Sequence, residues 1–157
     1  MTKSSRDQQP VTQWYVVCPA TADRQVVEQC CLAVLEVVRP RAERVWIDAY
    51  SDHRANLPAL AQQAQDELRS RGSLRTGRHR GDPGMAVELD PSRPADWELV
   101  RTYGPFSIHV ELAGLEDDLA TLDDSGLSIS VNLTEAEAGR LAGMLPEPLN
   151  LKVRGLR

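Results

Sequence analysis

The chain has 157 residues, of which 41% are hydrophobic and 26% are charged, and its formal net charge is −5. This length allows one domain with its own core, and the composition is that of a soluble globular protein. The negative charge argues against general affinity for nucleic acid or anionic membranes. No apolar run reaches the ~20 residues that a membrane-spanning helix needs.

Residues 1–11 are polar and are predicted to form a disordered tail, and residues 12–157 are predicted to form a single domain. The tail lacks the apolar segment of a signal peptide. Three cysteines without regular spacing do not suggest a disulfide framework, so they are interpreted as small core residues in a reducing compartment. We therefore expect a cytoplasmic protein. These cysteines are Cys18, Cys30 and Cys31.

The first half of the domain alternates between strand and helix patterns. Residues 13–18 are apolar on both sides, which predicts a central strand, and residues 21–38 carry a broad apolar stripe typical of a helix. A second strand is predicted over residues 44–50, and a second helix runs from about Asn56 to a terminating Gly72. This β-α-β-α order is compatible with a parallel crossover.

The second half is predicted to be a meander of strands with short connections. In the last two strands apolar and polar residues alternate cleanly, so one face is expected to pack and the other to meet water or a partner. Thr134 and Glu137 predict a capping box at the start of a third helix, and residues 149–153 predict a last edge strand. The meander strands are expected at residues 85–89, 97–103, 106–112 and 127–133.

Together these patterns predict an α+β fold with the architecture of a two-layer sandwich. A mixed, mostly antiparallel sheet of about six strands is expected to pack against two or three helices. A flexible basic loop is predicted over residues 70–84, because this segment is rich in glycine and arginine and contains the turn sequence Asp82-Pro83-Gly84.

Arginines are concentrated in and just before this loop, where no acidic residue separates them, and arginine can bind phosphate oxygens. Two observations weaken that interpretation. The segment has no aromatic residue on which a base could stack. Lysine occurs only at Lys3 and Lys152, which indicates a bacterial source with GC-rich codons, so a single arginine is weaker evidence for a phosphate contact. The candidate phosphate or nucleic-acid contacts are Arg69, Arg71, Arg75, Arg78 and Arg80.

Candidate catalytic residues surround two of the histidines. His53 follows the second strand and lies near Asp48 in sequence, a setting in which a general base can be imagined. His109 and Glu111 lie two residues apart on one predicted strand, so they share its polar face and can form a hydrogen-bonded pair. The alternative is that both histidines are ordinary surface or half-buried polar residues, because no pattern connects a nucleophile to either base.

No metal site and no cofactor are predicted. The acidic stretch lacks the spacing of a calcium loop and is interpreted as a solubilising connection or as half of an electrostatic interface. The glycine motifs of nucleotide-binding loops and the serine elbow of hydrolases are missing. The acidic stretch comprises Glu116, Asp117, Asp118, Asp123 and Asp124.

Three functions remain open. The first is a small cytoplasmic, non-catalytic interaction protein (an adaptor, an inhibitor or an immunity-type protein) that uses a polar sheet face or an exposed edge for protein–protein contacts. The second is an enzyme or small-ligand-binding domain with a pocket between sheet and helices. The third is nucleic-acid or phosphate contact through the arginine-rich loop, which the net charge disfavours. Homodimerisation is compatible with all three, and no membrane partner is expected.

Overall fold

A computed structural model describes residues 10–19, 23–50, 52–75, 82–146 and 151–154. Its strands are β1 (Thr12–Val17), β2 (Arg44–Ile47), β3 (Val87–Leu89), β4 (His109–Ala113), β5 (Asp118–Asp123), β6 (Ser128–Thr134) and β7 (Leu151–Val153). Its helices are α1 (Arg24–Val38), α2 (Ala59–Arg75), α3 (Pro94–Tyr103) and α4 (Glu135–Met144). Short 3₁₀ helices are η1 (Arg39–Arg41), η2 (Arg54–Asn56), η3 (Gly104–Phe106) and η4 (Asp124–Gly126).

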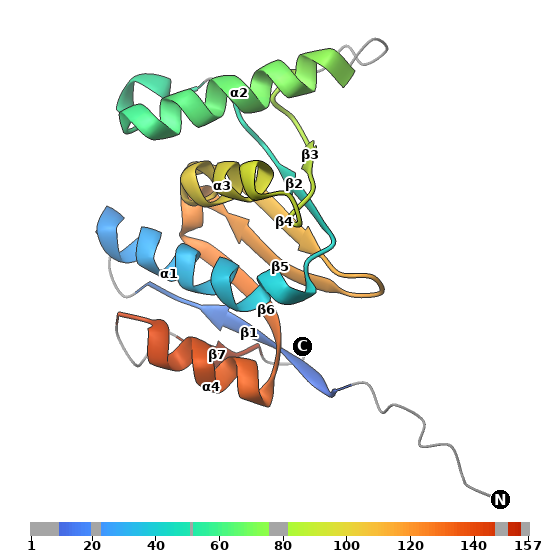
Figure 1. The fold of residues 1–157 in the computed structure, drawn as a ribbon. Helices are drawn as coiled ribbons and strands as arrows, with labels where there is room; N and C mark the ends of the chain where they lie inside the picture. Colours follow the sequence, from blue (N-terminus) through green and yellow to red (C-terminus); the bar gives the residue numbers. More distant parts are fainter. Residues whose placement is uncertain (1–9, 20–22, 51, 76–81, 147–150, 155–157) are drawn as a thin grey trace, which may run out of the picture.

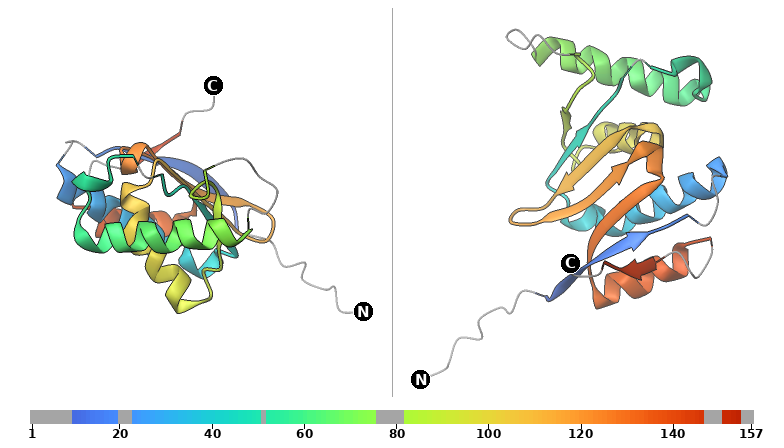
Figure 2. Two further views of the ribbon diagram at one scale, coloured as in Figure 1. Left: turned by 90° about the horizontal axis from the view of Figure 1, so that it is seen from above. Right: turned by 180° about the vertical axis from the view of Figure 1, so that it is seen from behind.

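The strands form one sheet in the order β3-β2-β4-β5-β6-β1-β7 (Figure 1), and every neighbouring pair is antiparallel. The helices lie on one side of this sheet, as the left view of Figure 2 shows. The α+β, two-layer prediction is therefore confirmed. Within the described ranges the sheet has seven strands and four helices accompany it, slightly more than expected.

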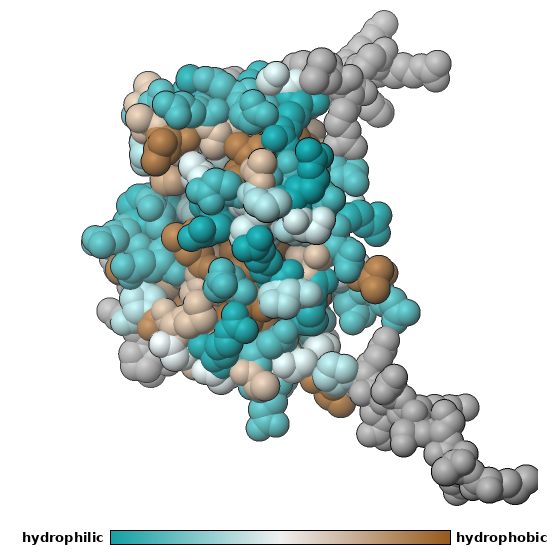
Figure 3. Space-filling view, in the orientation of Figure 1, coloured by the Kyte–Doolittle hydropathy of each residue, from teal (hydrophilic) through white to brown (hydrophobic). Residues whose placement is uncertain are grey.

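The core lies between the sheet and these helices. Asp23 caps the start of helix α1, because its side chain accepts hydrogen bonds from the amides of Gln25 and Val26. The helix buries an apolar stripe that includes Leu35. The strands contribute every second residue, such as Ile129 on β6. The outer side of the helix layer is mostly hydrophilic with scattered apolar residues (Figure 3). No helix in the described part of the chain is long and apolar enough to cross a membrane.

Strands β1 and β2 are not neighbours, yet they run in the same direction. Strands β6, β5 and β4 separate them, and four successive antiparallel pairings restore the original direction. The β1-α1-β2 unit is thus a wide parallel crossover, into which the later meander inserts. The β-α-β order was compatible with a parallel crossover, but the sheet contains only antiparallel pairs in the described residues.

Residues 97–103, predicted as a strand, form most of helix α3, so that prediction is wrong. A proline at its start, Pro94, and an acid in its first turn, Asp96, are typical helix-start residues. Three of its buried residues recur at intervals of three, a spacing that fits one face of a helix and not the alternation of a strand. They are Trp97, Val100 and Tyr103.

Strand β5 was not predicted, because acidic residues flank it. The interpretation of residues 116–124 as a connection is wrong for their middle part, where Leu119, Ala120 and Leu122 are buried. Strand β5 lies between β4 and β6 and pairs with both, so the meander consists of β4, β5 and β6. Strand β5 begins and ends with an aspartate, so its short apolar centre was not recognised as a strand pattern.

Helix α2 continues to Arg75, so the predicted loop at residues 70–84 overlaps its last turns. Gly72 does not end the helix. A Cβ atom at Gly72 would lie 1.6 Å from the carbonyl oxygen of Pro83, so glycine is needed there for the close approach of the 82–84 turn. Residues 76–81, with Arg78 and Arg80, lie outside the described part, as do residues 1–9 of the predicted tail and the start of the last predicted strand.

Candidate functional site

Within the described residues, no helix covers the second face of the sheet (Figure 2). Side chains alternate along each strand, so the residues between the buried ones point to this uncovered face. One row of register partners crosses the whole sheet, and none of its members is buried. From β3 to β7 the row is Glu88, Trp46, Glu111, Thr121, Ser130, Val16 and Lys152.

His109 lies beside this row and contacts two carboxylates. Its Nδ1 is 2.6 Å from Oδ1 of Asp123, its direct partner across the β4–β5 ladder. Its Nε2 is 3.7 Å from Oε2 of Glu111 on the same strand. The predicted proximity of His109 and Glu111 is therefore present. The closer partner, Asp123, was outside the prediction because it belonged to the acidic stretch.

Asp48 joins this cluster from the end of β2. Its backbone amide donates to the carbonyl of His109 at 3.0 Å, and its carboxylate accepts a hydrogen bond from the amide of Ala86 at 2.7 Å. Ser107 fixes the junction, because its hydroxyl lies 2.7 Å from the Asp48 carbonyl and 2.8 Å from the His109 carbonyl. Alternation placed Ser107 on the water-facing side, but it is fully buried.

The surrounding carboxylates favour the charged form of His109. The hydrogen bond to Asp123 raises the pKa of the imidazole above its usual value, partial burial opposes this rise, and the charges of Asp123 and Asp48 add to it. The imidazole thus holds its proton on the uncovered face to a higher pH than a free histidine does. A group of this kind can transfer a proton or change the charge of a binding surface.

Charge is unevenly distributed over the uncovered face. Strands β3, β4 and β5 and the residue that follows β2 each contribute one carboxylate to an area that we name the acidic patch, and Trp46 lies inside it. Arg44 adds a positive charge there and stacks over the Trp46 ring at 5.3 Å from its centroid. Toward β7 the face carries hydroxyls and Lys152 instead. The acidic patch comprises Asp48, Glu88, Glu111 and Asp123.

His53 is not part of this cluster. It lies exposed before η2 with a left-handed backbone, at φ 61°. Among the described residues no hydrogen bond or ion pair links its side chain to Asp48. The structure therefore brings together Asp48, His109 and Glu111 from the predicted set and leaves His53 apart.

Two of the predicted phosphate-binding arginines are engaged within the molecule. Arg69 forms an ion pair with Asp82 at 2.7 Å, and Arg71 forms one with the buried Asp96 at 2.6 Å. Asp82 lies within the predicted loop and Asp96 lies on α3, and neither ion pair follows from local spacing. Arg75 is the last residue of α2. Phosphate or nucleic-acid contact by this segment stays a prediction.

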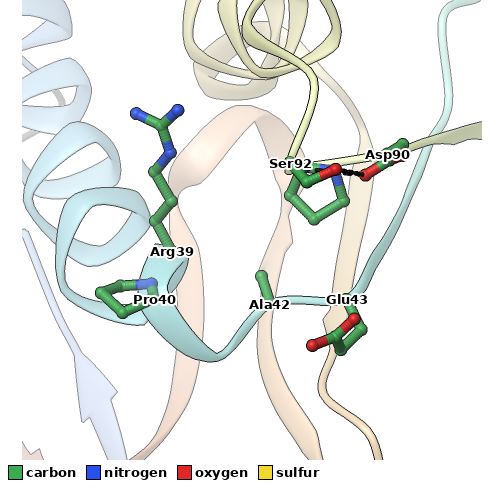
Figure 4. Close-up of a pocket in the computed structure, with 7 residues that line it drawn as sticks. Arg39, Pro40, Ala42, Glu43, Asp90 and Ser92 are labelled. Atoms are coloured by element: carbon green, nitrogen blue, oxygen red, sulfur yellow. Dashed lines mark hydrogen bonds between the residues drawn. The ribbon is translucent and has the colours of Figure 1, made fainter.

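A hollow of about 590 Å³ lies between η1 and the connection from β3 to α3 (Figure 4). Its polar groups partly satisfy one another, since the hydroxyl and amide of Ser92 both donate to Asp90. His109 lines neither this hollow nor two neighbouring ones. The hollow is lined by Arg39, Pro40, Ala42, Glu43, Asp90, Pro91 and Ser92.

No group of three histidine, cysteine or acidic side chains in the described ranges could hold a metal ion. Comparison of the chain with protein-family models, with curated proteins and with solved structures gave no match. The uncovered face, with its acidic patch and His109, is the arrangement from which a function can be argued.

Proposed function

We propose that this chain is a small, non-catalytic interaction protein that binds another protein through the uncovered face of its sheet. The observation that carries the proposal is a sheet face without a helix over it in the described structure, on which Trp14 and Trp46 are half-buried among polar side chains. Tryptophan surrounded by polar residues is typical of protein interfaces. An adaptor, an inhibitor or an immunity-type protein would act in this way.

The face supports this proposal better than the edges of the sheet do. The edge strands β3 and β7 have three residues each. A partner strand that paired with either one would gain few backbone hydrogen bonds. The face, in contrast, extends over every strand of the sheet, so it offers a much larger contact area.

We further propose that the protein acts in the cytoplasm of a bacterium. All three cysteines are free, and Cys18 is exposed. Free exposed thiols persist in a reducing compartment. The near absence of lysine, which leaves arginine as the main basic residue, supports a bacterial source with GC-rich codons.

Affinity capture from the native host tests the interaction with two matched variants. Thr121→Arg places a bulky charge in the middle of the uncovered face, whereas Gln29→Arg adds the same charge to the exposed side of α1. We expect the wild-type chain and Gln29→Arg to recover the same stoichiometric partner and Thr121→Arg to lose it. Circular dichroism confirms that each variant is folded. Recovery of the partner by Thr121→Arg would contradict the proposal.

A second candidate function, catalysis, has one observation in its favour. A carboxylate that holds an imidazole through Nδ1, as Asp123 holds His109 at 2.6 Å, is also the arrangement of many general bases. A ligand screen by thermal shift tests it with His109→Ala. An enzyme would lose its ligand response or turnover in this variant and would recover no protein partner, and an interaction protein would show the opposite pattern.

A further inference from the structure

We infer that the protein partner presents a basic surface to the acidic patch, and that His109 weakens this contact when the pH falls. The inference rests on the proposed function and adds the chemistry of the partner and the regulation of its binding. It combines two independent observations, namely the distribution of charge over the uncovered face and the position of one histidine within it.

Charge complementarity identifies the partner. The acidic patch brings four carboxylates together on adjacent strands, and Arg44 is the guanidinium among them in the described structure. Surfaces that associate place opposite charges against each other, which raises the association rate and rejects wrong partners. A basic protein surface therefore fits this half of the face. Nucleic acid, and the acidic patch of a second copy, would be repelled by it.

His109 is positioned to change the charge of the patch. The charged groups that face it are Asp123 from β5, Glu111 from its own strand and Asp48 from just after β2. Free carboxyl groups titrate near pH 4 and imidazole near pH 6.5, so imidazole is the group that changes charge around neutral pH. Loss of its proton removes the positive charge next to Asp123 and Glu111 and makes the patch more negative by one charge. A basic partner then binds more tightly.

Nona-arginine serves as the probe for the charge of the partner surface. Its binding to the full chain at low salt is measured by nuclear magnetic resonance for the wild type, Glu111→Lys and Glu36→Lys. Glu36 lies on the exposed side of α1, so both variants change the total charge equally. We expect the largest shifts at the Trp46 indole and the Glu111 amide, and a loss of affinity at least about fivefold greater in Glu111→Lys. Equal losses, or shifts centred on residues 116–118, would overturn the inference.

The pH arm repeats the measurement at about pH 6 and about pH 8.5. We expect wild-type affinity to be about two- to fivefold higher at the upper pH. His109→Gln, which is always neutral, should bind tightly at both values, and His109→Lys, which is always charged, should bind weakly at both. His53→Gln is the matched control and should keep the wild-type response. A pH response that survives in His109→Gln would refute the role of His109.

The two levels of the proposal can fail separately. If Thr121→Arg abolishes capture of the native partner but nona-arginine ignores the acidic patch, the interaction function stands and the basic-partner inference is wrong. If nona-arginine binds the patch but Thr121→Arg captures its partner normally, the function assigned to the face is wrong. Sedimentation of the chain alone shows whether a second copy occupies the face instead, which would also refute the inference.

Discussion

Arg41 binds both carboxylate oxygens of Glu137, with Nε and Nη2 at 2.8 and 2.9 Å from Oε1 and Oε2. The same Nη2 donates to the carbonyl of Asn132 at 2.6 Å, and Glu137 also accepts the backbone amide of Thr134 to complete the capping box. One carboxylate therefore joins η1, the end of β6 and the first turn of α4.

Glu137→Ala should lower the free energy of unfolding by about 2–3 kcal/mol, because it removes a half-buried bidentate ion pair and one half of a capping box together. Glu135→Ala removes an exposed acid from the same helical turn and should cost less than about 0.5 kcal/mol. Urea unfolding followed by circular dichroism measures both changes. If both variants lost the same free energy of unfolding, the contact between Glu137 and Arg41 would contribute nothing to stability.

The ion pair between Arg71 and Asp96 should contribute to the stability of the fold, although Arg71 lies in a segment that was predicted as a loop. Arg71→Gln leaves the buried Asp96 without its charge partner and should cost about 3 kcal/mol. Glu67→Gln removes the exposed partner of Arg71 and should cost less than about 0.5 kcal/mol. Chemical denaturation of the two variants separates these contributions.

Acid unfolding provides a second test of the same pair. Burial alone would raise the pKa of Asp96, but hydrogen bonds from Arg71 and from the amide of Asp90 outweigh it and lower the pKa below 3.8. The stability that Asp96 contributes is therefore complete above the unfolded value and is lost as the pH falls through the lower folded value. We expect Arg71→Gln to unfold at a higher pH than the wild type in an acid titration. Identical acid transitions would contradict this account.

Gly126 occupies a position that no other residue should tolerate. Its φ is 82°, and a Cβ there would lie 2.4 Å from Sγ of Cys31 and 2.9 Å from a methyl group of Val27. Gly126→Ala should destabilise the protein by about 2–4 kcal/mol through backbone strain and steric overlap. Gly139→Ala, in open space on α4, should stabilise it by about 0.5–1 kcal/mol. Thermal unfolding of both variants checks the opposite signs.

The titration of His109 can be followed by its ring protons in nuclear magnetic resonance spectra. Its folded pKa is raised, so protonated His109 contributes stability that is complete below about pH 6.5 and is lost as the pH rises through the folded value. Asp123→Asn should lower the midpoint, because it removes the main cause of the rise. In urea unfolding, the wild type should lose free energy of unfolding as the pH rises through the pKa of His109. The His109→Gln variant should not show this part of the loss. A midpoint that Asp123→Asn leaves unchanged would contradict the assignment.

Local patterns predicted the elements that local interactions determine. The stripe of α1, the alternation of β6 and the Thr134–Glu137 capping box each involve residues close in sequence, and each is present in the structure. Helix α3 was predicted as a strand because Trp97, Leu99 and Tyr103 occupy alternating positions, although Pro94 marks the start of a helix. Strand β5 was missed because its apolar centre is only four residues long between acids.

The site was predictable only in part, because it depends on strand register. The proximity of His109 and Glu111 follows from their spacing on one strand. The pairing of His109 with Asp123 requires the β4–β5 register, and that of Arg71 with Asp96 requires the packing of α2 on α3. Neither follows from periodicity. Asp123 had a visible signal, since it ends a short apolar segment that could have been read as a strand.

The cysteines differ sharply in their surroundings. Cys30 and Cys31 are buried on α1, and burial raises the pKa of the Cys31 thiol to about 12, whereas Cys18 is exposed directly after β1. The thiolate is the form that attacks an alkylating reagent, so a maleimide dye added at neutral pH will label the exposed Cys18 and leave the buried cysteines unmodified. The native sequence thus carries its own attachment point for a fluorophore, next to a strand of the proposed binding sheet, and recognition can be followed by anisotropy without engineering a single residue.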